Sequence, residues 1–232
     1  MKTLLPFLAL GGLFVTPANF QKTEKRNVGT YDGIHIAGSY EVTLVSGSEG
    51  TLQLKGDPED LEEIETEVKN GTLIVKQKEK SWFGNWDWNS GKVYITIPVE
   101  NINKVILSGS GKIISDISLE GDNFKTILSG SGDISLNLDV TSIDLKLTGS
   151  GDFILKGSAR EVLYKLTGSG TINATQIKAE YGVVKITGSG DIEMNTNKSL
   201  KVQITGSGDL VCYGNPPIQN TKVTGSGKIK IL

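Results

Sequence analysis

The residues best suited to binding chemistry lie in one short aromatic stretch between positions 81 and 91. All three tryptophans of the chain, Trp82, Trp86 and Trp88, fall within seven positions of one another and stand beside Phe83. Gly, Asn and Ser interrupt them, so the stretch predicts a loop. Tryptophan rings on a loop can stack against sugars or anchor a protein interface. In the competing interpretation, the rings plug the fold. This interpretation is favoured because stacked repeats need covered ends.

Aspartates at regular spacing are a second candidate, because glycine-rich repeats with regular Asp can bind calcium between coils. Four of them directly follow a recurring Gly-Ser-Gly tripeptide, but Lys112, Thr171 and Lys228 take the same place in other copies. A row interrupted in this way is a poor ion site. We therefore expect solvated turn positions, where Asp is locally favourable, and neither a metal nor a cofactor. The four residues are Asp133, Asp152, Asp191 and Asp209.

Catalytic chemistry finds little support in the residue types present. His35 is the only histidine and Cys212 the only cysteine, which argues against a His-dependent triad and against a His/Cys metal cluster. No spacing singles out a carboxylate pair of the kind that glycosidases use. We predict that the protein is not an enzyme; the alternative is a polysaccharide lyase or hydrolase on a β-helix scaffold.

A repeat must position these residues. The tripeptide Gly-Ser-Gly recurs seven times between Gly109 and Gly227, at intervals of 18 to 21 residues. An aliphatic residue stands two positions before each copy and an apolar one four positions after its first glycine, so the period is a stacked structural unit. Glycine supplies the backbone conformations that sharp corners need. The predicted corner glycines are Gly109, Gly111, Gly130, Gly132, Gly149, Gly151, Gly168, Gly170, Gly188, Gly190, Gly206, Gly208, Gly225 and Gly227.

Apolar and polar residues alternate around each tripeptide, as at Ile143, Leu145 and Leu147, which indicates strands with one buried face. A parallel β-solenoid with one coil per period fits this pattern, and so does an antiparallel meander with one hairpin per period. The recurring turn chemistry favours an all-β solenoid of about seven coils over roughly 30 Å. Each coil is expected to hold two short strands, a glycine corner and a looser middle corner. Cys212 falls at an inward, core position.

The chain divides into three predicted parts. Residues 1–18 have a basic start, an apolar stretch and small residues before a cleavage point after Ala18, as in a secretory signal. Residues 19–30 are polar and are predicted to form a flexible segment. The remainder forms one domain, with an irregular β cap at 31–100 and the repeats at 101–232.

Three short motifs in the cap predict local structure. Asp57-Pro58 predicts a helical turn, and Asn70-Gly71 predicts a two-residue hairpin. Gly38-Ser39 is similar to a degenerate first copy of the corner.

Charge and hydropathy limit the partners. The net charge is −2, and Lys and Arg are scattered along the sequence, which argues against nucleic acid. The apolar run of the signal is too short for a membrane span, and no transmembrane anchor is expected after its cleavage. The sequence therefore predicts export to the periplasm, the outer-membrane surface or the extracellular space.

Several of these motifs together resemble the head GIN domain family. The resemblance rests on the entry Tyr31–Ile34, the hairpin Glu67–Leu73, the strand Val93–Pro98 and the repeats that follow, and it spans roughly residues 28–232. Members are described as autotransporter adhesins, mainly from Bacteroidota, without an established activity. The resemblance implies an all-β binding or structural module of the cell envelope. Its expected partners are a surface glycan or an envelope protein, with oligomers formed through open solenoid ends.

Overall fold

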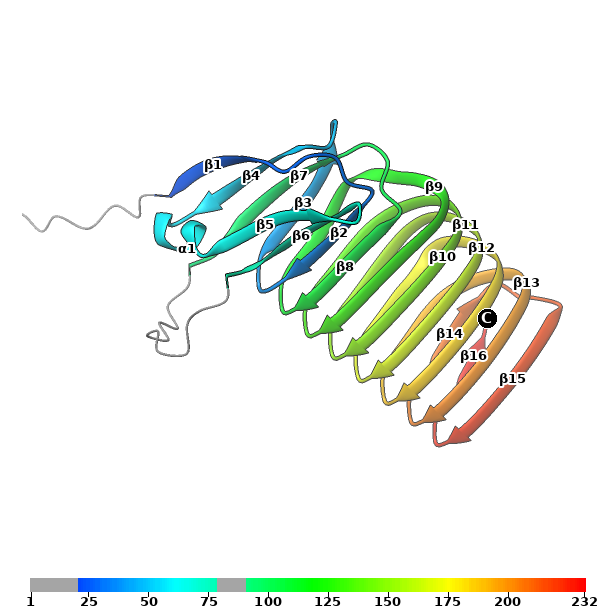
Figure 1. Ribbon diagram of the computed structural model, residues 1–232. Coiled ribbons are helices and arrows are strands. Elements are labelled where there is room, and N and C mark those ends of the chain that lie inside the picture. Colours follow the sequence, from blue (N-terminus) through cyan, green and yellow to red (C-terminus); the bar gives the residue numbers. More distant parts are fainter. Residues whose placement is uncertain (1–20, 79–90) are drawn as a thin grey trace, which may run out of the picture.

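A computed structural model describes residues 21–78 and 91–232 and shows a mostly β protein, a parallel β-solenoid of about seven turns with a mixed N-terminal sheet region (Figure 1). The predicted signal at 1–18 and the aromatic residues Trp82, Phe83, Trp86 and Trp88 lie outside the described residues.

In the solenoid, the five longest strands each run from one glycine corner to the next, and the strands at its two ends are shorter. Neighbouring strands pair in parallel, and equivalent corner residues are in register, as for Gly130, Gly149 and Gly168. This register confirms the solenoid and excludes the meander. The strands are β8 (Lys104–Gly109), β9 (Lys112–Gly130), β10 (Asp133–Gly149), β11 (Asp152–Gly168), β12 (Thr171–Gly188), β13 (Asp191–Gly206), β14 (Leu210–Tyr213), β15 (Ile218–Gly225) and β16 (Ile229–Ile231).

The middle corner differs from its expected form. From β9 to β13, a single strand of 16 to 19 residues bends around this side of the coil, in place of two short strands and a loop. At the expected middle corner of β10, the ladder skips one residue, because Thr141 has no register partner in either neighbouring strand. The ladder continues around the bend because each coil pairs with coils of the same shape above and below it.

The glycine corner allows neighbouring backbones to approach closely. At Gly149, φ is +126°, and an added Cβ would collide with the carbonyl oxygen of Gly130 in the preceding coil. The same oxygen accepts the backbone N–H groups of Ser150 and Gly151 at 3.0 and 3.1 Å. Both the left-handed backbone and the lack of space require glycine at this position.

The core fills the space between the two sheets of the solenoid. Its side chains stack in columns, and Cys212, which is fully buried, pairs in register with Met194 on one side and Ile231 on the other. In the last coil, Gln219 and Thr221 stand in register with the buried Leu200 and Val202. The inward positions of β15 are therefore more polar than those of the coils before it.

The N-terminal region adds one more coil and then extends both sheets. Strands β2 and β3 flank Gly38 and pair in parallel with β8 and β9, and the corner at Gly109 packs on Gly38. Gly38 thus holds the place of a first corner. The β5–β6 hairpin turns at Asn70 and Gly71, whose φ angles of 49° and 72° fit the predicted turn. The elements are β1 (Lys22–Asn27), β2 (Gly33–Ala37), β3 (Glu41–Ser46), β4 (Thr51–Gly56), α1 (Pro58–Glu62), β5 (Ile64–Lys69), β6 (Thr72–Gln77) and β7 (Tyr94–Val99).

Part of the segment expected to be flexible is ordered. Within residues 19–30, β1 pairs antiparallel with β4. The guanidinium of Arg26 in β1 donates to the carbonyl oxygens of Leu61 and Ile64, at 2.6 Å each. The polar composition of this segment did not indicate a strand. A strand at the edge of a sheet can be polar, because a side chain such as arginine can donate hydrogen bonds to backbone carbonyl groups at the end of the core.

We predict that Gly149→Val lowers the free energy of unfolding by about 3 kcal/mol or more, because it combines backbone strain with a collision against Gly130. Urea unfolding followed by circular dichroism measures the change. Ser150→Val, at the exposed residue of the same corner, is the control and should change stability by less than about 0.5 kcal/mol. Equal stability of both variants would contradict the packed-corner structure.

We predict that Cys212→Asp costs about 3 to 5 kcal/mol, because it places an unpaired charge in the core. Val211→Asp changes the adjacent, outward-facing residue of β14 and should cost far less. Thermal and urea unfolding of the two variants measure the difference. A tolerated Asp at position 212 would show that the inward register of this strand is misassigned.

Candidate functional site

The candidate site lies where the first full coil bends without a coil above it. From Ser118 to Phe124, β9 pairs with β10 on one side. On the other side, β3 reaches only as far as Ser115 and β8 begins to pair at Lys125. No described strand therefore covers this edge, and its backbone groups remain available to a ligand.

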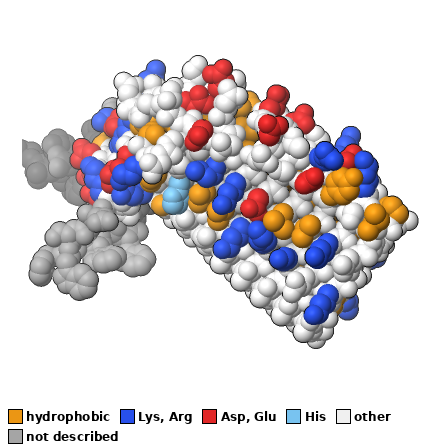
Figure 2. Space-filling model, turned by 45° about the vertical axis from the view of Figure 1, so that its right-hand side comes forward, with side chains coloured by type: hydrophobic (Ala, Val, Ile, Leu, Met, Phe, Trp, Pro, Cys, Tyr) orange, Lys and Arg blue, Asp and Glu red, His pale blue; other side chains and the backbone are white. Residues whose placement is uncertain are grey.

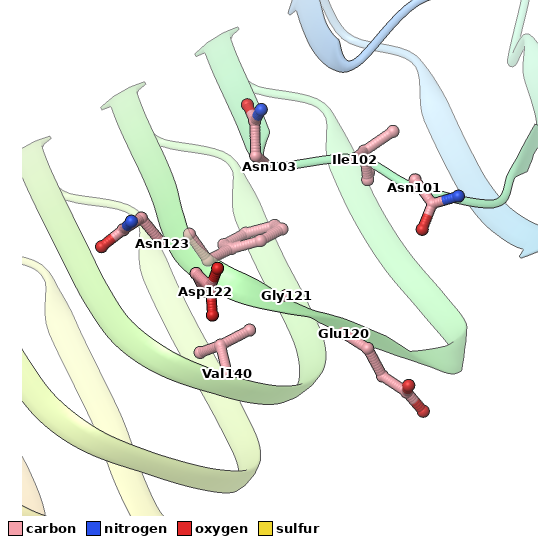
Figure 3. Close-up of a pocket in the computed structure, with 9 residues that line it drawn as sticks. Asn101, Ile102, Asn103, Glu120, Gly121, Asp122, Asn123 and Val140 are labelled. Atoms are coloured by element: carbon pink, nitrogen blue, oxygen red, sulfur yellow. The ribbon is translucent and has the colours of Figure 1, made fainter.

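A short connection between β7 and β8 closes this edge into a pocket of about 350 Å³, here called the corner pocket. The connection supplies one wall, β9 the other, and Val140 of β10 the far side (Figure 3). The lining residues are Asn101, Ile102, Asn103, Glu120, Gly121, Asp122, Asn123, Phe124 and Val140.

Hydrogen bonds hold the connecting wall in place. The carboxylate of Glu49 accepts the backbone N–H groups of Glu100 and Asn101 at 2.6 and 3.0 Å. Partial burial works to raise the pKa of Glu49, but these two hydrogen bonds, together with one from its own backbone, outweigh it, and the pKa is lowered. The backbone of Asn103 donates to Asp32 and accepts from Lys125, both at 2.8 Å. The wall is therefore preorganised.

The pocket combines an apolar floor with a polar rim. Ile102, Phe124 and Val140 are 4%, 2% and 7% exposed and form the floor. On the rim, Asn123 accepts a hydrogen bond from Ser142 at 2.7 Å. Within the described residues, the side chains of Asn101 and Asn103 make no hydrogen bond, so their amide groups are free for a ligand.

The two carboxylates of the pocket do not form a catalytic pair. In Figure 3 the side chain of Glu120 extends away from the other lining residues, whereas Asp122 lies between Asn123 and Val140. Asp122 also accepts a hydrogen bond from Thr141 at 3.4 Å. Two acids that diverge in this way have no common point at which to act on one glycosidic bond.

Three of the four aspartates that follow the tripeptides accept hydrogen bonds from the backbone. Asp152, Asp191 and Asp209 each accept the backbone N–H of the equivalent residue in the next coil, at 3.0, 2.8 and 2.7 Å. No group of three or more His, Cys, Asp or Glu side chains able to hold a metal occurs in residues 21–78 and 91–232. In this row, Asp links successive coils.

The only histidine and the only cysteine of the sequence lie away from the corner pocket. His35 in β2 shares a hydrogen bond of 3.0 Å with the hydroxyl of Ser108, and burial together with the nearby Lys104 lowers its pKa. Burial also raises the pKa of the Cys212 thiol, as expected of an inert core cysteine. Neither residue lines the pocket.

Sequence reasoning did not identify the corner pocket. Asn101 and Asn103 lie before the first tripeptide and about twenty residues from Glu120. Their only local signal is a short polar connection between two alternating segments. The predicted aromatic binding residues at 82–88 remain a prediction.

Comparison with known proteins adds a family. The family model described as "Putative auto-transporter adhesin, head GIN domain" matches residues 30–216. No curated protein matches the chain. Among the described residues, no helix has the length and apolar character needed to cross a membrane.

Solved structures share the fold. A protein named a putative adhesin, from Bacteroides fragilis NCTC 9343, is 24% identical with a TM-score of 0.84, covering 93% of this chain and 99% of that one. One named a putative lipid binding protein, from Parabacteroides distasonis ATCC 8503, is 22% identical with a TM-score of 0.74, covering 91% and 96%. A putative adhesin from Parabacteroides merdae ATCC 43184 is 19% identical with the same TM-score and coverage.

We predict that Asp191→Ala lowers the free energy of unfolding by about 1 kcal/mol, because the N–H of Asp209 loses its acceptor. Asp191→Asn keeps a side-chain oxygen and should lose less. Asp133→Ala is the control, since the carboxylate of Asp133 makes no hydrogen bond in the described structure. Urea unfolding measures all three, and a calcium-dependent rise in Tm that Asp191→Ala abolishes would contradict the structural role.

Proposed function

Since the chain belongs to the head GIN domain family, we propose that it is an exported, non-enzymatic binding module of the cell envelope that holds a neutral glycan in the corner pocket. The basic and apolar start of the chain supports export. The family description supports a role in adhesion.

The composition of the corner pocket carries the proposal. Small-molecule sites are concave, with an apolar lining and a few placed polar groups, and span about 300 to 1,000 Å³. At about 350 Å³, the pocket has room for one or two sugar rings. Its floor of Ile102, Phe124 and Val140 suits the apolar face of a ring, and the rim supplies donors and acceptors to the hydroxyl groups.

The charged residues of the corner pocket determine which sugars it favours. Glu120 and Asp122 are both in the lining, and no Lys or Arg is. Carboxylates accept hydrogen bonds from hydroxyl groups and repel anionic substituents. The free amides of Asn101 and Asn103 donate as well as accept, which suits a hydroxyl or an N-acetyl group. We therefore favour neutral hexoses and N-acetylhexosamines over acidic sugars.

The test is a binding screen of the purified protein on an array of neutral and acidic oligosaccharides. Calorimetric titration with the best neutral hit then compares the protein with its Asn101→Ala/Asn103→Ala variant. Neither side chain makes a hydrogen bond within the described structure, so the variant should keep its Tm. We expect at least about tenfold weaker binding, from the loss of hydrogen bonds to the ligand.

A matched control separates the pocket from general surface effects. Asn197→Ala/Asn215→Ala removes two exposed amides from other coils and should bind like the unchanged protein. A triple Trp82, Trp86 and Trp88→Ala variant tests the aromatic stretch. If that variant loses glycan binding while staying folded, and the Asn101/Asn103 variant does not, the corner pocket is not the site. Hydrolysis or elimination of any arrayed glycan would contradict the non-enzymatic assignment.

A further inference from the structure

Every repeat coil places one lysine on the same flank of the solenoid. In each coil the lysine lies three or five residues before the first glycine of the corner. Neighbouring strands are in register, so these positions form two adjacent outward columns on the sheet made by β8, the second halves of β9 to β13, and β15. We call this set the lysine stripe: Lys104, Lys125, Lys146, Lys165, Lys185, Lys201 and Lys222.

The stripe is straight, narrow and accessible. Successive coils are about 4.8 Å apart, so seven lysines follow an axis of roughly 30 Å, and the two columns lie about 7 Å apart. Lys104 and Lys165 are partly buried, and the other five are exposed. Figure 2 shows Lys side chains following one another along this flank with hydrophobic ones between them.

Few acids neutralise the stripe. In the two columns from Lys104 to Lys222, the only acidic residue is Asp144, whose carboxylate pairs with the Lys165 ammonium at 3.3 Å. The ammonium of Lys104 donates to the Thr72 hydroxyl at 2.8 Å. Within the described chain, the remaining five lysines have no ion-pair partner. A protein of net charge −2 therefore carries a row of uncompensated positive charge.

From this geometry we propose that the lysine stripe binds a linear anionic polysaccharide, laid along the solenoid axis. A chain with one carboxylate or sulfate on each sugar ring presents its charges at about the interval at which the coils present lysine. Each exposed ion pair contributes little binding free energy. When one rigid chain forms several such pairs, their contributions add, because the pairs after the first form within one complex. The aliphatic residues Leu163 and Val183, which share the columns, offer apolar contact to the faces of the rings.

The shape of the stripe argues against other polyanions. Single-stranded nucleic acids are held by aromatic side chains that stack on bases, and neither column contains one in these seven coils. A membrane surface is a broad plane of charge, whereas this stripe is about 7 Å wide. A single extended chain matches the long, narrow form.

This site is separate from the corner pocket. The pocket is lined by carboxylates and takes a neutral sugar, whereas the stripe is basic and takes an acidic one. Failure of either site leaves the other unaffected, because they are tested with different ligands and different variants.

The experiment titrates the full protein with an octamer of galacturonic acid, a dimer of the same sugar and neutral maltooctaose, at two salt concentrations. We expect the octamer to bind at least tenfold more tightly than the dimer, salt to weaken it, and maltooctaose not to bind at this site. A Lys146→Gln/Lys185→Gln/Lys201→Gln variant should bind the octamer roughly 100-fold more weakly. This value assumes that each lysine contributes as much binding free energy as a lysine close to an anionic membrane surface.

A matched variant removes the same charge from the opposite sheet. Lys112→Gln/Lys156→Gln/Lys230→Gln changes three exposed lysines there and should alter octamer binding by less than about threefold, because long-range charge effects are screened by salt. Equal losses in both variants would overturn the proposal, since net charge alone would then explain binding. Absence of octamer binding, maltooctaose binding that the Lys146→Gln/Lys185→Gln/Lys201→Gln variant also weakens, or preference for anionic phosphatidylglycerol vesicles would overturn it as well.

Discussion

The approach of each corner glycine to the carbonyl oxygen of the preceding coil sets the geometry of the stack. At Gly149 the neighbouring backbone occupies the space of a Cβ, and the φ of +126° disfavours any other residue. Because the contact repeats from Gly109 to Gly225, the coils are held in one register. The parallel ladders, the core columns and the flat outer faces all depend on this register.

A fixed register converts periodic residues into columns. Inside, it aligns apolar side chains such as Met194 and Cys212 into a continuous core. Outside, it aligns carboxylates so that Asp191 caps the N–H of Asp209, and it aligns lysines into the stripe. The same register that stabilises the chain on one face would, under the proposal above, present a row of charge for recognition on another, since a ladder of identical groups is favourable only where each group meets a complementary one.

The corner pocket arises where the register begins. Above the bend of β9 no described strand is paired, because β3 pairs with β9 only as far as Ser115 and the chain crosses from β7 to β8 through Asn101–Asn103. This leaves a strand edge that the connection only partly covers. Elsewhere along the described repeats, each bend from β10 to β12 is paired on both sides. A pocket at the end of a repeat array therefore follows from the loss of one neighbour.

The sequence by itself determined the fold, the corners, the Asn70-Gly71 hairpin and the helical turn at Pro58, because glycine spacing and alternation act over short stretches of chain. Tertiary structure alone decided the strand at β1, the continuous bends and both proposed sites. Lysines 16 to 21 residues apart look scattered in the sequence, and Asn103 gives no sign of its approach to Phe124. Such residues meet only when stacking at about 4.8 Å brings distant segments together, and that distance is a property of the folded backbone.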